Sequence, residues 1–225
     1  MGEIPMLNKP FQFRSFIIFV GGISILALLV PFVKAQSRYP ETISVLKTSY
    51  SDEVQALHTY AAYAQKAHSE GYPNIAHLFV ALAASETVHA RNFKKILSDL
   101  GAVVEKTPMP EISVSSTRKN LKEATGVELQ EIDTKYPKFI QKIKPEKCEA
   151  AIQDITYAWK SEHQHRELLE KIRSATGMFF GLLAKKIEGA PADYFVCQRC
   201  GSTVLELPKD SCPICGSTVS NYKRV

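Results

Sequence analysis

A glutamate followed three positions later by a histidine occurs in "ASETVHA" and again in "KSEHQHRE". The first pair is Glu86 and His89, and the second is Glu162 and His165. Residues three positions apart lie close together on one face of a helix, so each pair can reach a common metal ion. A single pair is more often a solvated helix edge, because glutamate favours helices and surfaces. Two pairs on two long helical segments indicate that the helices hold a metal between them.

Other helical segments offer the carboxylates that such a site needs. Glu53 lies in "YSDEVQALHTY", and Glu128 and Glu131 lie in "TGVELQEIDTKYP". One glutamate from each of two helices, with Glu-x-x-His from each of the other two, is the ligand set of di-iron bundles. Four carboxylates neutralise two divalent irons, and imidazoles complete nitrogen–oxygen sites. Burial of so many acids without a cation would be prohibitive, so the set predicts a di-iron centre.

Four of the five cysteines form a second candidate metal site. They stand in "CQRCG" and "CPICG", as Cys197, Cys200, Cys212 and Cys215. Four thiolates at this spacing form a tetrahedral sulfur site for iron or zinc. In each tight turn, a glycine permits the left-handed backbone conformation, and N–H groups can point at sulfur. The cysteines therefore predict a metal site rather than a disulfide framework, with iron expected and zinc as the alternative.

Helical periodicity predicts four long helices that would position these ligands. They are expected over about 43–70, 74–100, 116–144 and 146–175, with 189 as the alternative end of the last. Tyr136-Pro137 is expected to bend the third helix. Each helix would span roughly 40 Å, and the long connection between the second and third separates two antiparallel pairs. This pattern predicts an all-α, ferritin-like four-helix bundle over 36–189.

The segment 190–225 differs from the bundle in its short β-prone runs "DYFVC" and "STVLEL" and in its cysteine pairs. It is predicted to be a second, small module.

Residues 1–35 are expected to be a signal peptide or a membrane anchor. The run Phe16–Val33 has 18 residues without a charge and is preceded by Lys9 and Arg14. Such a run is long enough to cross a bilayer. Its end, "VKA" before Gln36, also resembles a signal-peptidase site, and cleavage is slightly favoured over an uncleaved anchor. The protein is therefore expected to be periplasmic, or anchored to the membrane and facing outside the cytoplasm.

Composition narrows the remaining possibilities. Apolar residues make up 45% of the 225 residues, as in ordinary globular proteins, and the net charge is +5. Since the basic residues form no block or stripe, nucleic acid is not an expected partner. The other histidines are expected at the surface or at helix ends, Trp159 in a core or interface, and Cys148 as a plain thiol. These histidines are His58, His68, His77 and His163.

From about Thr42 to Val225 the chain resembles the rubrerythrins, which join a ferritin-like di-iron bundle to a rubredoxin-like Fe(Cys)₄ module. The resemblance rests on "HSEGYPNIAHLF", "ASETVHARNF", "NLKEATGVELQEIDTKYP", "WKSEHQHRELLEKI" and "CQRCG…CPICG". It implies seven di-iron ligands: Glu53, Glu86, His89, Glu128, Glu131, Glu162 and His165. Two departures are the turn "KPEKCEA", which lacks the family's glycine-rich loop, and the N-terminal segment.

The resemblance also implies particular roles for individual residues. In the family, one iron exchanges a histidine for the seventh carboxylate as its oxidation state changes, and these ligands correspond to His89 and Glu131. Two tyrosines near the family's site correspond to Tyr60 and Tyr136. The resemblance implies a catalytic part for both tyrosines, although for either residue taken alone, packing with a satisfied hydroxyl is the commoner role.

The function implied by the resemblance is that of a non-haem di-iron peroxidase in oxidative-stress defence. It would reduce hydrogen peroxide to water with electrons passed from the Fe(Cys)₄ centre to the di-iron site. A head-to-tail homodimer and an unidentified redox donor protein are the expected partners, with a membrane contact through an uncleaved N-terminal segment. The alternatives are an electron carrier or redox sensor, and a ferroxidase that handles iron.

Overall fold

The computed structural model describes residues 38–104, 111–173 and 192–225. The predicted signal or anchor segment, and the possible extension of the last helix to 189, lie outside these residues. Within the described ranges, no helix combines the length and the apolar character that crossing a membrane requires.

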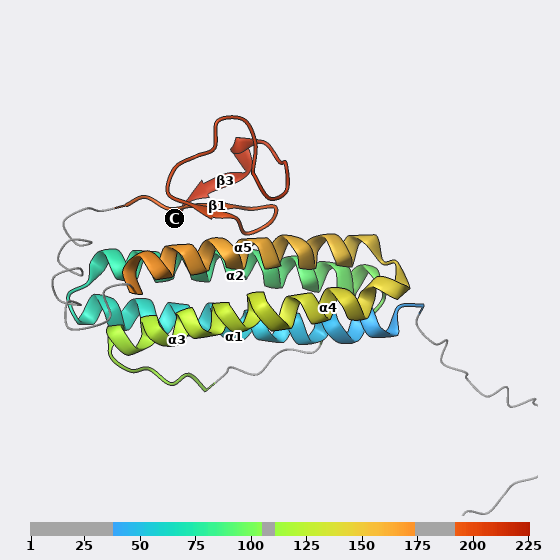
Figure 1. Cartoon of the computed structure of the whole chain (residues 1–225), viewed down its shortest axis with the longest axis horizontal. Helices are drawn as coiled ribbons and strands as arrows, with labels where there is room; N and C mark the ends of the chain where they lie inside the picture. Colours follow the sequence, from blue (N-terminus) through green and yellow to red (C-terminus); the bar gives the residue numbers. More distant parts are fainter. Residues whose placement is uncertain (1–37, 105–110, 174–191) are drawn as a thin grey trace, which may run out of the picture. The chain divides into compact units, whose positions relative to one another are not determined.

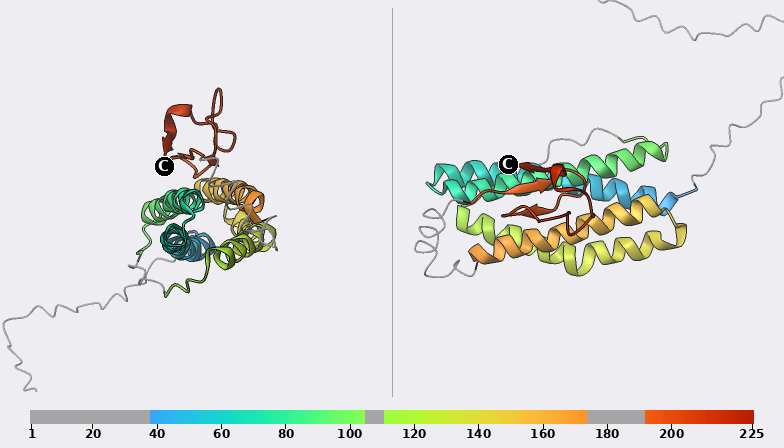
Figure 2. Two further views of the ribbon diagram at one scale, coloured as in Figure 1. Left: turned by 90° about the vertical axis from the view of Figure 1, so that its left-hand side faces the viewer. Right: turned by 90° about the horizontal axis from the view of Figure 1, so that it is seen from above.

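Four helical rods run alongside one another and form the bundle (Figure 1). Seen end-on, they surround a common axis (Figure 2). The prediction of a four-helix bundle is therefore confirmed. The first two rods are α1 and α2, and the last is α5. The third is a composite of α3, a π-helical segment, α4 and a 3₁₀ turn. The bounds are Pro40–Ser69 for α1, Pro73–Asp99 for α2, Thr117–Gln130 for α3, Glu131–Lys135 for the π segment, Tyr136–Ile143 for α4, Lys144–Glu146 for the 3₁₀ turn and Glu149–Arg173 for α5.

The third rod differs from the bent α-helix that the sequence predicts. Its irregularity lies just before Tyr136, where the π segment begins at Glu131. Pro137 explains part of this change, because proline has no N–H to continue the α-helical ladder. The Trp159 indole N–H donates to the carbonyl of Ile132 inside the π segment, 2.9 Å away. Trp159 is therefore an interface residue that satisfies a backbone acceptor where the regular pattern is interrupted.

Carboxylates from other elements cap two helices. Glu146 accepts the backbone N–H groups of Glu41 and Thr42 at 2.9 and 2.8 Å, at the start of α1. Glu70 accepts the N–H of Thr117 at 2.8 Å, at the start of α3. These bonds satisfy N–H groups that lack partners within their own helices and match the positive end of the helix dipole. They fix the relative heights of neighbouring rods.

The turn before α5 has no glycine, yet it contains a left-handed residue. Lys147 adopts φ 54° there, in the position that a glycine would occupy more easily. The turn "KPEKCEA", which lacks the family's glycine-rich loop, thus has a lysine in the left-handed conformation.

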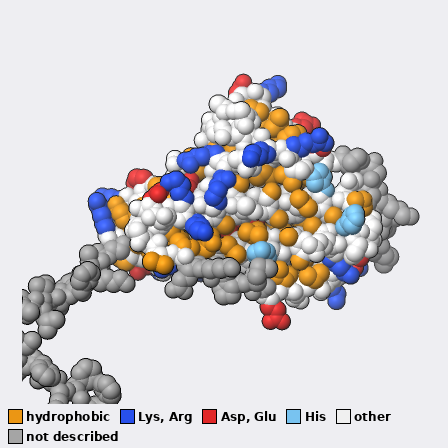
Figure 3. Space-filling view, turned by 180° about the vertical axis from the view of Figure 1, so that it is seen from behind, with side chains coloured by type: hydrophobic (Ala, Val, Ile, Leu, Met, Phe, Trp, Pro, Cys, Tyr) orange, Lys and Arg blue, Asp and Glu red, His pale blue; other side chains and the backbone are white. Residues whose placement is uncertain are grey.

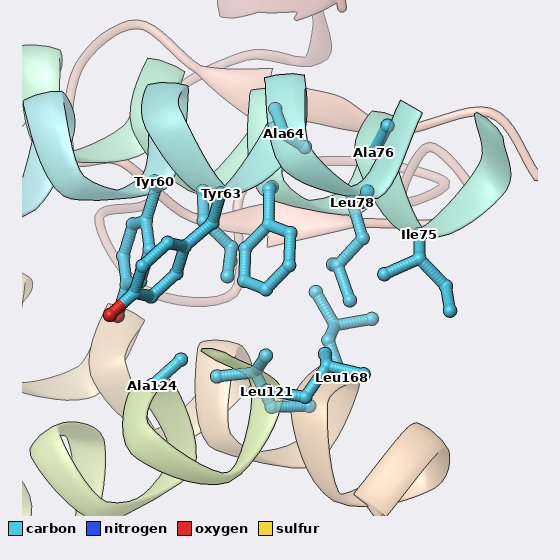
Figure 4. Packing of buried hydrophobic residues seen from close by; sticks show 14 of the residues in the cluster. Tyr60, Tyr63, Ala64, Ile75, Ala76, Leu78, Leu121, Ala124 and Leu168 are labelled. Carbon is cyan, nitrogen blue, oxygen red and sulfur yellow. The ribbon is translucent and has the colours of Figure 1, made fainter. Parts of the chain in front are cut away.

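Two hydrophobic clusters fill the bundle and leave a polar layer between them. One contains Leu78, Phe79 and Leu169 (Figure 4). The other contains Leu46 and Phe93. Along α1, α2 and α5 the predicted ligands stand between the residues of these clusters, so apolar packing on both sides excludes water from the layer.

The cysteine module is a three-stranded antiparallel sheet in the order β2-β1-β3, and with residues of the bundle it belongs to one compact unit. Its strands are β1 Phe195–Cys197, β2 Thr203–Val204 and β3 Tyr222–Arg224. The β-prone runs contain β1 and β2. The third strand, which was not predicted, pairs with β1 so that Cys197 lies opposite Tyr222.

Candidate metal centre

Six of the seven predicted di-iron ligands converge in the polar layer. None of these six is more than 3% exposed. Their ligand atoms form two groups, in each of which all atoms lie within 4.8 Å of one another. The first group is Glu53, Glu86, His89 and Glu162, and the second is Glu86, Glu128, Glu162 and His165. Glu86 and Glu162 belong to both groups, so the six residues would hold two metal ions, and each of these two carboxylates could serve either ion.

The contacts in this layer suit metal ligands better than mutual hydrogen bonds. His165 Nδ1 lies 2.8 Å from a Glu162 oxygen, and His89 Nδ1 lies 3.2 Å from the other. Nevertheless, both Glu162 oxygens and His165 Nδ1 lack a hydrogen bond of acceptable geometry. Buried polar atoms seldom remain unpaired. These atoms approach one another closely but point toward shared centres, as the ligands of a bound cation do. The residues present therefore fit two metal ions.

The opposite nitrogen of each imidazole is positioned by its own polar neighbour. His89 Nε2 lies 3.2 Å from the carbonyl oxygen of Cys200. His165 Nε2 lies 3.4 Å from the Thr203 hydroxyl and 3.5 Å from the Ser161 hydroxyl. A ring N–H directed at an oxygen leaves Nδ1 as the lone-pair nitrogen, which is how ligating histidines are usually oriented.

Without a cation, the layer must hold protons. Burial raises the pKa of Glu53 to about 8 and the pKa of Glu131 to about 7. Burial, and then the Glu162 carboxylate, raise the pKa of Glu128 well above its usual value. Burial also opposes ionisation of Glu162, but the His165 imidazolium holds its pKa below the usual range. Burial disfavours the charged His165 ring, yet Glu162 raises the pKa of His165 to about 10. A metal ion would displace these protons on binding.

Both predicted tyrosines donate to ligand carboxylates. The Tyr60 hydroxyl on α1 donates to Glu128 on α3 at 2.5 Å. The Tyr136 hydroxyl on α4 donates to Glu53 on α1. Burial first, and then the neighbouring carboxylates, raise the pKa of each phenol well above its usual value, so both remain protonated donors. Their hydroxyls orient one terminal carboxylate in each ligand group.

Glu131 stands apart from the six converging ligands. It is the first residue of the π segment. Its carboxylate forms an ion pair with Lys135 at 2.7 Å, and Lys135 also pairs with Asp52 at 2.9 Å. Its side chain is 13% exposed, in contrast to the buried ligands. The structure therefore places the predicted seventh ligand beside the metal layer, held by a lysine.

The four cysteines of the module form the second predicted site. Their sulfur atoms all lie within 4.8 Å of one another, and none forms a disulfide. The Cys197–Cys215 and Cys200–Cys212 pairs are 3.8 and 3.5 Å apart. Four sulfurs bonded tetrahedrally at about 2.3 Å would be separated by roughly 3.8 Å, so the spacing fits one metal ion.

Backbone groups shape both cysteine turns. Gly201 and Gly216 follow the pairs with φ of 82° and 68°, the left-handed conformation that was predicted. The backbone N–H of Arg199 hydrogen bonds to the Cys197 thiol. Such N–H groups stabilise the charge of a metal-bound thiolate.

Residues that the sequence did not identify connect the module to the bundle. Ser85 on α2 donates to the carbonyl of Gly201 at 2.7 Å, and Asn92 donates to that of Arg199 at 2.8 Å. A Cβ on Gly201 would lie 2.2 Å from His89 Nε2, so this glycine permits the close approach. Spacing gave no signal for Ser85 or Asn92, because their partners lie more than a hundred residues away.

The minor sequence candidates lie outside both metal sites. None of the four other histidines belongs to a ligand group found in the described residues. His77 has a structural contact, with its Nε2 2.8 Å from the carbonyl oxygen of Val225. Cys148 is buried in a hydrophobic cluster. It is a packed thiol, as predicted.

Known proteins share the sequence pattern and the fold. Residues 44–173 match the family model described as Rubrerythrin. Rubrerythrin-2 of Clostridium acetobutylicum is 28% identical over 183 residues, which are 78% of this chain and 91% of the relative. Nigerythrin of Nitratidesulfovibrio vulgaris is 30% identical over 176 residues, which are 77% and 81% of the two chains.

Solved structures agree with these sequence relationships. Nigerythrin in its fully reduced, all-ferrous state aligns with a TM-score of 0.68 and 27% identity, and covers 82% of this chain and 86% of that one. The bacterioferritin of Desulfovibrio desulfuricans aligns with a TM-score of 0.63 and 21% identity over 68% and 90% of the chains. At that identity, the second likeness shows a shared ferritin-like fold alone.

Proposed function

Because the chain belongs to the rubrerythrin family of di-iron proteins with a rubredoxin-like module, we propose that it is a peroxidase that reduces hydrogen peroxide to water. The observation that carries the proposal is the 3.2 Å approach of His89 Nε2 to the carbonyl oxygen of Cys200. One of these residues is a predicted ligand of the two-metal site, and the other is a predicted ligand of the thiolate site.

Iron is the metal that gives both sites a redox function. Two ferrous ions would supply the two electrons for cleavage of the O–O bond, and the thiolate-bound iron would return electrons one at a time. The overall reaction consumes one hydrogen peroxide, two electrons and two protons and yields two waters. Zinc at the four cysteines would interrupt this supply, so the proposal requires iron at that site.

The residues of the bundle prepare the metal layer for this reaction. Tyr60 and Tyr136 hold the terminal carboxylates Glu128 and Glu53 in place by hydrogen bonds. The hydrophobic clusters on both sides keep water away and lower the local dielectric, which strengthens these contacts. Glu131, held beside the layer by Lys135, would supply a further carboxylate to a bound metal ion.

The module and the bundle meet in a way that supports electron return. Ser85 and Asn92 bind the backbone of the first cysteine turn and hold it against α2. An imidazole N–H directed at the Cys200 carbonyl makes a short hydrogen-bonded link between the ligands of the two sites. Neither an iron store nor an isolated electron carrier requires this link.

We also propose that the protein forms a homodimer and works outside the cytoplasm. The face of the bundle opposite to that of Figure 1, where α1 and α2 lie, exposes hydrophobic side chains among lysines and arginines (Figure 3). Apolar surface rimmed by polar groups is typical of interaction sites. The N-terminal sequence is the basis for the proposed location.

Steady-state turnover under anaerobic conditions tests the peroxidase proposal. Iron-loaded protein with a chemical reductant is expected to consume peroxide in proportion to the electrons supplied, two per molecule, without releasing oxygen. Release of oxygen, or peroxide loss independent of the reductant, would exclude a peroxidase.

A further inference from the structure

We infer that a small uncharged oxidant reaches the metal layer through a pocket between α1 and the third rod. The identity of the oxidant rests on the proposed function, whereas the route rests on the geometry alone. The pocket has a volume of about 260 Å³. Its lining includes Asp52, Tyr60, Glu123, Val127, Glu131 and Lys135.

The pocket borders the most exposed of the seven predicted di-iron ligands. The six converging ligands are at most 3% exposed, and the module covers His89 and His165 with Cys200 and Thr203. Glu131 is 13% exposed and lines the pocket, beside Lys135 at 25%. The module therefore covers the layer at the two histidines, whereas one predicted ligand, Glu131, is reached from the pocket.

The inner end of the pocket contacts groups of the metal site. Tyr60 lines the pocket and also donates to Glu128, a ligand of the second group. Figure 4 shows the Tyr60 ring extending from α1 toward the helix that carries Ala124. A molecule in the pocket would therefore lie beside Glu131 and beside Tyr60, whose hydroxyl holds a terminal ligand.

The charges of the pocket favour an uncharged molecule. Lys135, the cation among its described lining residues, is already paired with Glu131 at 2.7 Å and Asp52 at 2.9 Å. Glu123 adds a third carboxyl group. An anion would meet excess negative charge, whereas hydrogen peroxide can both donate and accept hydrogen bonds there. Since a water occupies about 30 Å³ in the liquid, the volume accommodates a molecule of two oxygens.

Paired substitutions at two similarly exposed valines test this route. Val127 lines the pocket and is 42% exposed, whereas Val114 precedes α3, is not among the lining residues and is 44% exposed. Val127→Trp should obstruct the mouth, and Val127→Ala should widen it. Val114→Trp controls for the added indole. Metal content and absorption spectra should match the wild type in all three variants, and sizing should show an unchanged oligomer.

Two probes keep the route separate from the peroxidase reaction. Stopped-flow absorbance would follow the reaction of the reduced, iron-loaded protein with hydrogen peroxide and, separately, its binding of nitric oxide, a small uncharged molecule. Val127→Trp is expected to slow both by about tenfold, with Val114→Trp unchanged and Val127→Ala equal to or faster than wild type. Equal nitric oxide rates in Val127→Trp and Val114→Trp would overturn the route. If nitric oxide binding depended on Val127 but peroxide did not react, the route would stand and the peroxidase proposal would fall.

Discussion

His89 and Cys200 join the two metal sites, since the imidazole Nε2 lies 3.2 Å from the cysteine carbonyl oxygen. The Nδ1 of the same ring faces Glu86 at 2.9 Å and Glu162 at 3.2 Å. One side chain thus contacts the carboxylate layer at one nitrogen and the thiolate turn at the other. This relationship explains why a glycine must follow Cys200, because a larger residue would occupy the space of the imidazole.

Gly201→Ala should separate the two sites functionally while both still bind metal. The added Cβ would lie 2.2 Å from His89 Nε2 and 2.8 Å from the Ser85 hydroxyl, so the module must move away from α2. We expect electron return to the bundle to slow by about tenfold or more, measured by stopped-flow absorbance after peroxide addition.

Gly216→Ala is the matched control for that substitution. Gly216 has a similar left-handed φ of 68°, but among the described residues no atom beyond its chain neighbours lies within 4 Å of its added Cβ. If electron return slowed equally in the two variants, its cause would be strain of the backbone and not the contact with His89.

Removal of either ligand-bound tyrosine hydroxyl should weaken metal binding. Tyr60→Phe and Tyr136→Phe each leave a buried carboxylate without its donor. Loss of such an outer partner typically lowers metal affinity by about 10- to 100-fold. Competition with a chelator would measure the change. Tyr63→Phe, equally buried on α1 but not bonded to a ligand, should bind metal as the wild type does. Unchanged affinity in both test variants would argue that the hydroxyls only pack.

Glu131→Ala should retain the fold and both metal sites but cripple peroxide turnover. Glu131 belongs to neither converging ligand group, so two metals can still bind. We expect turnover to fall by about 10- to 100-fold, as for other residues that adjust a metal site. Turnover at the wild-type rate would contradict a role for this carboxylate in the reaction.

The metal-free protein should become less stable as the pH rises. Burial raises the pKa of Glu53 and Glu131 from 4.5 to about 8 and 7. The folded protein therefore binds these protons more tightly than the unfolded chain does. Their stabilisation is complete below about pH 4.5 and is lost as the pH rises through 7 and 8. Each unit of pKa difference corresponds to about 1.4 kcal/mol.

Thermal unfolding in the presence of a chelator checks this prediction. The Tm of the metal-free protein should fall between about pH 5 and pH 8, and Glu53→Gln should flatten the change. Metal-loaded protein should lack this fall, because the metal replaces the protons. A Tm of the metal-free protein that rises over the same range would contradict the proton-holding layer.

Much of the bundle and the ligand set follows from local sequence. Glu-x-x-His spacing places Glu86 beside His89 on any regular helix, so this part of the site needs no tertiary information. The π segment could not be predicted from local sequence in the same way. Pro137 indicates a bend, but the extra-wide turn starting at Glu131 depends on contacts such as that of the distant Trp159. The junction at Ser85 and Gly201 joins residues 116 positions apart, which no local pattern reveals. The strand Tyr222–Arg224 has only three residues, too few for periodicity to detect.

A single turnover shows whether the thiolate-bound iron supplies electrons for peroxide reduction. Purified protein would be loaded with iron, fully reduced without oxygen, and mixed with one equivalent of hydrogen peroxide while visible absorbance is recorded. We expect about three irons per chain and rapid appearance of the ferric-tetrathiolate spectrum as peroxide disappears. A thiolate site that holds zinc, or that stays reduced while peroxide persists, would contradict this expectation.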